Sequence, residues 1–303
     1  MLPTSGVIKF SDIESEFLGT TPVSFSQYYR GAGLVPLTGF GNNANIPTGG
    51  TIQISDFYGT RRAFPFLRTL GNTFDYNFYN DAVDAGWNET LPIIGRVVIS
   101  PDCYVGSTSR LSAAFHVDVL PDGSSLELVL STGSIIVGKG GTGGTGAPSG
   151  TCGCSAGGDG TDGGFSLKLE FPVHIINDGT IGAPGGGGGG GGAECSYIWN
   201  ASAGGGGGGA GFGDGGGING CGVTLNRFGS PGKQGTAFLG GLGGSRGNDF
   251  TAFGGYGGGL GQSGKAGQTI SAAGGRPGAP GQAIINVSNA IYIRQGTIIG
   301  TVV

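Results

Sequence analysis

Apolar and polar residues alternate in three short copies of one pattern near the start of the chain. The copies are "GVIKFSDI" from Gly6, "TPVSFSQYY" from Thr21 and "GTIQISDFYG" from Gly50. The alternation predicts a short strand, and the Ser-Asp or Ser-Gln that follows predicts an N-cap and one helical turn. We therefore expect a small α+β unit over residues 1–62. Its expected core consists of Phe10, Phe25, Tyr28, Tyr29, Ile54, Phe57 and Tyr58.

The next segment has the patterning of an ordinary globular domain. "FDYNFYNDAVDAGW" (Phe74 to Trp87) predicts a helix with Phe78, Val83 and Trp87 near one face. The strand-like runs "LPIIGRVVIS", "CYVGSTS", "AAFHVDVL" and "SLELVLSTGSIIVG" follow, separated by turn residues. This rhythm predicts a β-rich middle domain over residues 63–137, either a β-sandwich or a short β-solenoid.

One strand pattern recurs beyond that domain. Its copies are "LELVLSTGSIIVG", "FPVHIINDGTIGA" and "AIYIRQGTIIGTVV". In the second copy, Asp178-Gly179 predicts a type I′ hairpin. Because glycine blocks separate the copies, we expect the glycine segments to leave and rejoin a β scaffold, with strand excursions at 165–181 and 283–303.

Glycine accounts for 73 of the 303 residues and falls into bursts with a period of three, such as Gly229, Gly232 and Gly235. Three residues per turn is the polyproline II repeat. Collagen needs an unbroken G-X-Y pattern, which these short bursts lack. A disordered glycine linker is the alternative, but bulky residues alternate with the bursts and disfavour it. We predict a bundle of packed polyglycine II helices over residues 138–303, which makes the chain mainly β plus polyglycine II.

Successive antiparallel bursts would place their connections alternately at the two ends of such a bundle. The connections are 193–203, a turn near Asp214, 223–228, 236–239, 248–253 and 268–273. The first, third and fifth then share one end, and they carry aromatic residues and an arginine, which are typical of binding hot spots. The predicted binding residues are Tyr197, Trp199, Asn200, Arg227, Phe228, Asn248, Asp249, Phe250 and Phe253.

Charge and cysteine content narrow the classes of function. Charged residues make up 11% of the chain and the net charge is −4, so no basic field for nucleic acid is present. No apolar stretch reaches the roughly 20 residues of a spanning helix, and the first residues do not resemble a signal peptide, which predicts synthesis in the cytoplasm. Free thiols are favoured, with a Cys195–Cys221 disulfide as the alternative. The cysteines are Cys103, Cys152, Cys154, Cys195 and Cys221.

No motif predicts a catalytic site, a metal or a cofactor. "GQSGKAG" and "GSPGKQG" lack the end of a phosphate-binding loop. "GGDGTDGGF" is a single imperfect copy of a calcium-binding repeat that functions only when stacked. His116 and His174 alternate with apolar neighbours, so we interpret both as strand residues. The acidic candidates for glycoside cleavage are interpreted as solvated or helix-surface carboxylates; they are Asp75, Asp81, Asp84 and Glu89.

Several motifs together resemble tailed-phage tail proteins. "SGVIKFSDIESEFLGTTPVSFSQYYRGAGLVP" with "IPTGGTIQISDFYG" resembles the leading segment of many tail-tip and fibre proteins. "YNDAVDAGWNETLPIIGRVVIS" and "GSIIVGKGGTGG" resemble glycine-rich tail proteins. The C-terminal half is similar in design to the distal adhesin of T-even-type long tail fibres, whose glycine motifs hold loops against the host receptor.

The resemblance implies a virion protein of the tail tip or tail fibre, made in the host cytoplasm, and not an enzyme. It implies that residues 1–62 dock on other tail or baseplate proteins, and that the C-terminal loops bind an outer-membrane protein or a surface glycan. It implies either a cap on a separate fibre or a fibre that is itself a homotrimer. The alternative is a minor tail component whose glycine block serves only virion assembly. The expected docking residues are Phe10, Phe25, Tyr28, Tyr29, Phe57 and Tyr58.

Overall fold

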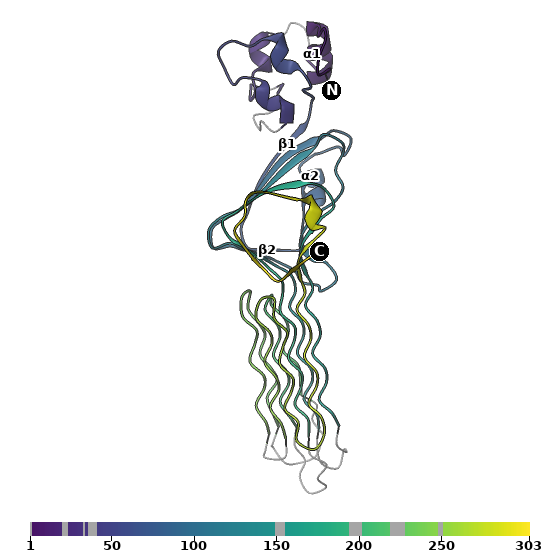
Figure 1. The fold of residues 1–303 in the computed structure, drawn as a ribbon, viewed down its shortest axis with the longest axis vertical. Coiled ribbons are helices and arrows are strands. Elements are labelled where there is room, and N and C mark those ends of the chain that lie inside the picture. Colours follow the sequence, from purple (N-terminus) through teal and green to yellow (C-terminus); the bar gives the residue numbers. More distant parts are fainter. Residues whose placement is uncertain are drawn as a thin grey trace.

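A computed structural model describes residues 2–19, 24–32, 34–35, 41–148, 155–193, 202–218, 228–247 and 251–303. The molecule is elongated and has three parts (Figure 1). A helical N-terminal unit sits at one end and a β-solenoid forms the middle. Long glycine-rich runs extend from the solenoid to the opposite end. In the described part of the chain, no helix is both long and apolar enough to cross a membrane.

The N-terminal unit is built from short helices around an apolar core. Its helices are α1 (Phe10–Phe17) and the 3₁₀ helices η1 (Phe25–Tyr28), η2 (Gly41–Asn45) and η3 (Ile54–Phe57). Ile13, Phe17, Tyr28, Ile46 and Phe57 are buried between them. The three sequence copies thus give α1, η1 and η3 as predicted.

The strands predicted ahead of these helices are not present in the described part of this unit, which has only an isolated bridge between Arg30 and Val35. The α+β prediction is therefore wrong for the first and third copies, since two or three alternating residues without a partner strand do not establish a ladder. The strand predicted at Thr21–Val23 lies outside the described residues. The N-cap predicted at the Ser of Ser-Asp or Ser-Gln is wrong in all three copies, because each helix begins two residues earlier than predicted. In the second copy Ser24 takes the place of Ser26 as N-cap and forms a capping box with Gln27. In the other two copies Asp12 and Asp56 occupy the third helical position and accept from the N-cap backbone.

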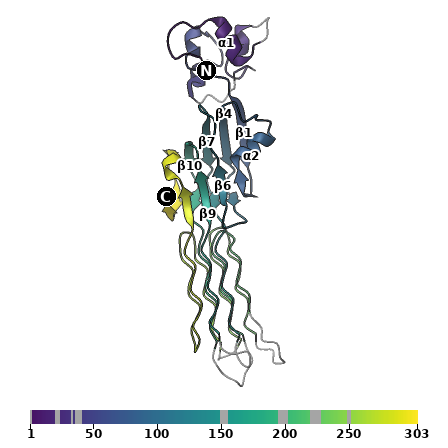
Figure 2. The ribbon, with the colours of Figure 1, turned by 90° about the vertical axis from the view of Figure 1, so that its right-hand side faces the viewer.

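The solenoid consists of three parallel sheets, each receiving one strand from every coil of the chain. Sheet 1 contains β1 (Phe64–Leu70), β4 (Ile93–Ile99), β7 (Ser125–Leu130), β10 (Val173–Asn177) and β13 (Ala290–Arg294). Sheet 2 contains β2 (Thr73–Phe74), β5 (Tyr104–Gly106), β8 (Ile135–Val137), β11 (Thr180–Gly182) and β14 (Thr297–Ile299). Sheet 3 contains β3 (Tyr76–Asn77), β6 (Ala113–Val117), β9 (Phe165–Leu169), β12 (Gln282–Ile285) and β15 (Thr301–Val302). Figure 2 shows neighbouring strands of sheet 1 side by side.

Inward-facing residues of the three sheets fill one continuous core. Val97, Leu128 and Ile175 occupy one register position of sheet 1 in successive coils and are fully buried. Helix α2 (Phe78–Asp84) packs on the solenoid core within the segment Phe74–Trp87 predicted as helix, but the first residues of that segment form β2 and β3 instead. Phe78, its first residue, fills the space over Gly95, where a Cβ atom would lie 2.8 Å from the ring. The 3₁₀ helix η4 (Val287–Asn289) precedes β13.

The recurrent strand pattern predicted from the sequence is the unit of this solenoid. Each copy supplies the sheet 1 and sheet 2 strands of one coil, namely β7–β8, β10–β11 and β13–β14. The solenoid alternative is therefore correct and the sandwich is not. The hairpin at Asp178-Gly179 is also wrong, because β10 and β11 lie in different sheets and each pairs in parallel with a strand of the preceding coil. The strands at 165–182 and 282–302 thus continue the sheets that begin within residues 63–137.

The glycine segments are two insertions into the solenoid at the same corner. Residues 138–164 connect β8 to β9 and residues 183–281 connect β11 to β12, both between sheet 2 and sheet 3. Within them the chain runs back and forth in extended, laterally hydrogen-bonded segments (Figure 1). Bonds recur at every third residue: the N–H groups of Gly141, Gly144 and Ala147 donate to the carbonyls of Gly185, Gly188 and Gly191 at 2.8–3.0 Å.

Glycine occupies the positions where these runs touch. The run 185–192 and the run 204–210 lie inside the block, and their glycines contact other runs on every side. A Cβ on Gly206 would lie 2.0 Å from the carbonyl oxygen of Gly188. The peripheral run 228–236 has glycine only at 229, 232 and 235, and these positions face the block. The glycine period of three is therefore the period of contact between runs.

Candidate functional site at the end of the glycine runs

The residues that flank three of the predicted loops lie together at the end of the glycine block that is farthest from the solenoid. Ser202 pairs with Pro148 in an isolated bridge, and its carbonyl accepts from the N–H groups of Gly229 at 3.0 Å and Gly247 at 3.2 Å. Ala193 pairs with Thr251 in the same way. These residues flank the predicted loops 193–203, 223–228 and 248–253. The flanks of all three loops thus meet at one end, as predicted.

Most of the predicted binding residues lie outside the described part of the chain. These are Tyr197, Trp199, Asn200, Arg227, Asn248, Asp249 and Phe250. The cysteines of the alternative disulfide, Cys195 and Cys221, also lie outside it, and Cys103 is a free thiol. Phe228 and Phe253 are described and have 50% and 46% of their surface exposed. The guanidinium of Arg246 lies 5.5 Å from the centre of the Phe253 ring.

One connection is at the opposite end from the one predicted. The sequence placed 268–273 away from the loops, but the N–H of Ala272 donates to the carbonyl of Ala193 at 3.0 Å. The reason is an additional turn at Leu260–Gly261, where Gly261 has φ +64° and packs against Gly300 of the solenoid. The sequence signal was available, since residues 251–273 are too long for a single run.

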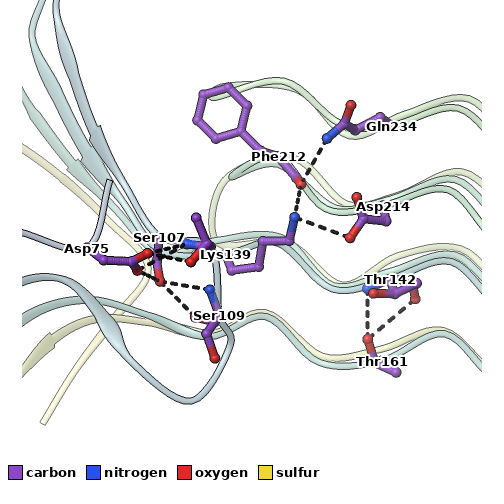
Figure 3. Close-up of polar contacts among 10 residues, drawn as sticks. Asp75, Ser107, Ser109, Lys139, Thr142, Thr161, Phe212, Asp214 and Gln234 are labelled. Carbon is purple, nitrogen blue, oxygen red and sulfur yellow. Dashed lines mark hydrogen bonds and ion pairs between the residues drawn. The ribbon is translucent and has the colours of Figure 1, made fainter. Parts of the chain in front are cut away.

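The turns at the solenoid end are fixed by a polar junction (Figure 3). The ammonium of Lys139 donates to the carbonyl of Phe212 at 2.7 Å and pairs with Asp214 at 3.2 Å. Gln234 donates to the same carbonyl at 3.4 Å. The predicted turn near Asp214 lies at 210–212. Because Lys139 lies two residues after the end of β8, it joins this turn to the solenoid.

Apolar side chains complete the junction. The Phe212 ring lies 5.0 Å from that of Tyr104 and 5.5 Å from that of Phe74, between ring centres. Ala237 and Leu260, from the other two turns at this end, pack with Phe212 against Ile135 and Val137 of β8. The solenoid thus anchors one end of the glycine block through three turns and leaves the other end free to carry loops.

The predicted docking residues of the N-terminal unit divide into core and surface. Tyr28 and Phe57 are fully buried, with ring centres 6.1 Å apart. The Tyr29 hydroxyl donates to the carbonyl of Gly50, and that of Tyr58 donates to the carbonyl of Gly6. These four residues support the fold of the unit. Phe25 is 44% exposed beside the partly buried Phe10, with 4.6 Å between the ring centres. Phe25 is therefore the aromatic residue that this unit presents to solvent most openly among the six.

Three of the four acidic residues weighed for glycoside cleavage, Asp75, Asp81 and Glu89, have hydrogen-bond partners. Asp81 pairs with Arg68 and accepts from the Tyr76 hydroxyl at 2.8 Å. The hydrogen bond from Arg68 lowers the pKa of the Asp81 carboxyl, and burial raises that of the Tyr76 hydroxyl. Desolvation alone would raise the pKa of Asp75, but hydrogen bonds from Thr108 and Ser107 outweigh it and lower that pKa.

Other acidic residues of the motifs discussed above also accept hydrogen bonds within the fold. Asp159 and Asp162, from the imperfect calcium repeat, accept from the N–H groups of Arg276 and Ala279 at 2.6 Å and bind two runs together. Glu89 accepts from the Tyr79 hydroxyl. These carboxylates are thus hydrogen-bonded within the fold.

One cluster in the described part of the chain has the side chains of a metal site. His116, Asp118 and Glu170 lie on the outer side of sheet 3, and the His116 Nε2 atom is 3.6 Å from a carboxylate oxygen of each acid. Each acid has a second partner. Lys168 lies 2.6 Å from Glu170 and lowers the pKa of its carboxyl, and the Asn77 amide donates to Asp118 at 2.7 Å. The cluster therefore has the bonding of an ion-pair network between neighbouring coils. His116 and His174 both lie on strands, as interpreted from the sequence.

Comparisons with known proteins agree with this architecture. The sequence model of the family "Phage tail fibre adhesin Gp38" matches residues 66–303. A crystal structure titled as the gp37-gp38 adhesin tip complex of the bacteriophage S16 long tail fibre contains a similar chain. It has a TM-score of 0.51 and 25% sequence identity, and the match covers 84% of this chain and 88% of that one. No curated protein sequence matches the chain.

Proposed function

Because the chain belongs to the phage tail fibre adhesin Gp38 family, we propose that it attaches the tail fibre to the host through the loops at the free end of its glycine block. The observation that carries this proposal is the convergence of the loop flanks around Ser202 and Ala193, at the end opposite to the N-terminal unit. Loops on a rigid scaffold lose little entropy on binding and can change in sequence without changing the fold.

We further infer that the glycine runs are polyglycine II helices. Two features support this: lateral hydrogen bonds recur at every third residue, and glycine occupies most positions of close contact between runs. Both follow from a helix of three residues per turn without internal hydrogen bonds. Backbone angles near −75° and +145° in a high-resolution experimental structure would establish this. Extended β geometry with a two-residue period would refute it.

The aromatic residues and the arginine of these loops indicate the class of ligand that the loops bind. An outer-membrane protein or a surface glycan suits them, because Trp, Tyr and Arg supply large contact areas and charge-assisted hydrogen bonds. The alternative, a tail component that serves only assembly, predicts that the loops are covered on the intact virion. Cleavage of the loops by added protease on intact virions would count against that alternative.

Attachment to the virion is proposed through the N-terminal unit. Residues 1–65 lie outside the family match, so this unit is a feature that the family model does not describe. The related S16 chain was crystallised as a gp37-gp38 complex. By analogy, we propose that this chain binds another tail fibre or baseplate protein, with the exposed Phe25 in the contact. Light scattering of the purified chain distinguishes a monomeric cap from a homotrimer.

The decisive test measures binding of the full-length protein to host cells. Trp199→Ala with Phe250→Ala is expected to weaken binding at least about tenfold, the effect of losing a hot-spot aromatic. Phe238→Ala is the matched control, because Phe238 is 49% exposed in the turn at the solenoid end of the same block. Equal binding by the double variant and the wild type, with equal melting temperatures, would rule out these loops as the receptor site.

A further inference from the structure

A groove lies on the side of the glycine block, apart from the loops at its end. It has a volume of about 510 Å³ and is lined by Phe253, Tyr256, Lys265 and Gln268. Its floor is formed mainly by glycine backbone of the runs 240–247 and 251–259. The groove is therefore a shallow channel bordered by aromatic side chains on one run and polar side chains on the next.

The two aromatic side chains are held on the surface at a fixed spacing. Phe253 is 46% exposed and Tyr256 is 56% exposed. They are three residues apart on one run, which corresponds to roughly 9 Å at the ~3.1 Å rise of an extended three-residue helix. The equivalent positions on the run 240–247, whose carbonyls also accept from the next run, are Ser245 and Leu242, so packing between runs does not require an aromatic side chain there.

The layer that carries the groove is cationic. Residues 228–281 contain four basic residues, Lys233, Arg246, Lys265 and Arg276, and one acidic residue, Asp249, although the whole chain has a net charge of −4. The runs 155–164 and 211–218 contain Asp159, Asp162 and Asp214 instead. The charge is thus divided between different runs of one block, and this layer attracts anions.

Several backbone groups around the groove are already hydrogen-bonded between runs. The N–H groups of Lys265 and Gln268 donate to the carbonyls of Tyr256 and Phe253 at 2.8 and 3.0 Å. Those of Gly254 and Gly255 donate to other runs. A ligand that adds a strand would need these groups. Ring faces and the polar tips of side chains are therefore the main groups that the groove offers to a ligand.

We propose that this groove binds an acidic saccharide. A sugar ring stacks on Tyr256 or Phe253, and its phosphate or carboxylate pairs with Lys265 and with Arg246, whose guanidinium is already placed over the Phe253 ring. Within the described residues, the Lys265 ammonium and the Tyr256 hydroxyl have no hydrogen-bond or ion-pair partner. This inference rests on the proposed function and adds a second contact with the bacterial surface, along the side of the block.

The test titrates three soluble probes into the full-length protein by calorimetry. The probes are a phosphorylated lipopolysaccharide core oligosaccharide, the same oligosaccharide after dephosphorylation, and an oligogalacturonate. Binding of the first probe alone identifies phosphate as the anionic group, and binding of the third identifies carboxylate. Tyr256→Ala and Lys265→Gln are each expected to weaken that binding about tenfold, since hydrogen bonds to charged groups and stacked rings contribute on that scale.

Two control variants distinguish saccharide binding in the groove from binding elsewhere on the protein. Lys233→Gln removes a cation from the same layer but outside the groove, and Phe25→Ala removes an exposed aromatic residue of the N-terminal unit. Both should bind like the wild type. Trp199→Ala should lose cell binding but keep the oligosaccharide, so failure of the loop proposal and failure of this one are distinguishable. Absence of saccharide binding, or equal binding of a single-stranded oligonucleotide, would overturn the assignment.

Discussion

Substituting alanine for a glycine inside the block should destabilise the protein by an amount that the structure sets. At Gly207 an added Cβ would lie 2.0 Å from the carbonyl oxygen of Gly241, whereas real Cβ contacts stay beyond 3.0 Å. The runs must therefore separate by at least 1.0 Å, the difference between 3.0 and 2.0 Å. The hydrogen bonds from Gly207 to Gly255 and from Gly241 to Gly208, now 2.8 and 2.7 Å long, would not survive that shift.

The lower limit of each free-energy cost gives the smallest expected loss of stability. Overpacking costs about 1–3 kcal/mol. Each buried N–H left without a partner costs about 1–3 kcal/mol. One overpacking contribution and two unpaired groups therefore amount to at least about 3 kcal/mol, which lowers the melting temperature by roughly 6 °C or more in a chain of this size.

Calorimetry of Gly207→Ala against Gly217→Ala tests this reasoning. Gly217 lies in the same block, but an added Cβ there meets nothing within 4 Å. Neither glycine has a positive φ, so neither backbone excludes alanine. Gly217→Ala should leave stability unchanged or raise it by about 0.4–1 kcal/mol, because alanine restricts the unfolded chain. A Gly207→Ala protein that melts within about 2 °C of the wild type would refute close packing at this position.

Three further perturbations test the solenoid and its junction. Phe115→Ala removes a fully buried ring of sheet 3 and should cost about 3–5 kcal/mol in urea unfolding; a loss below about 1 kcal/mol would contradict this packing. Lys139→Met keeps the aliphatic stem but removes the ion pair with Asp214. The free energy of unfolding should fall by about 1–3 kcal/mol, and protease cleavage at 210–214 should increase. Unchanged cleavage and stability would show that the junction does not depend on the ammonium. Because Arg68 holds the pKa of Asp81 below its usual value, this pair stabilises the folded state above about pH 4 and its contribution falls as the pH drops through the lowered pKa. Melting temperatures between pH 2 and 6 should therefore fall less steeply for Asp81→Asn, and an unchanged slope would count against the pair.

The sequence predicts the strands of the solenoid but not which strands pair with one another. Each recurrent strand pattern marks a coil, yet alternation alone cannot distinguish a strand that turns back in a hairpin from one that turns a corner into another sheet. At Asp178-Gly179 the local turn signal favoured a hairpin. The parallel partners of β10, which lie 47 residues earlier (Val173 with Leu126) and 117 residues later (Val173 with Ala290), decide otherwise. Pairing over such separations is a tertiary effect, outside the reach of a local pattern.

The candidate site could be predicted in outline because the spacing of the glycines indicates where neighbouring runs contact one another. The flanks of the loops 193–203, 223–228 and 248–253 share one end because the runs between them have similar lengths. The turn at Leu260–Gly261 was missed, since its residues do not interrupt the glycine pattern, and the connection at 268–273 was misplaced as a result. The side groove also escaped prediction. It needs the lateral pairing of Tyr256 with Lys265, which only the folded block establishes.

The solenoid also explains how so much glycine acquires a defined register. β8 and β11 pair in parallel, and the runs that leave them continue side by side, with Gly141 bonded to Gly185 and then Gly144 to Gly188. The returning runs are paired as well: the N–H groups at 157, 160 and 163 donate to the carbonyls at 273, 276 and 279 before the chain enters β9 and β12. Glycine runs alone can slide by three residues at little cost, because every register offers the same contacts. Two pairs of runs fixed by sheet hydrogen bonds remove that freedom. The side chains of sheets 2 and 3 therefore determine where the loops at the far end begin, although they lie at the other end of the block.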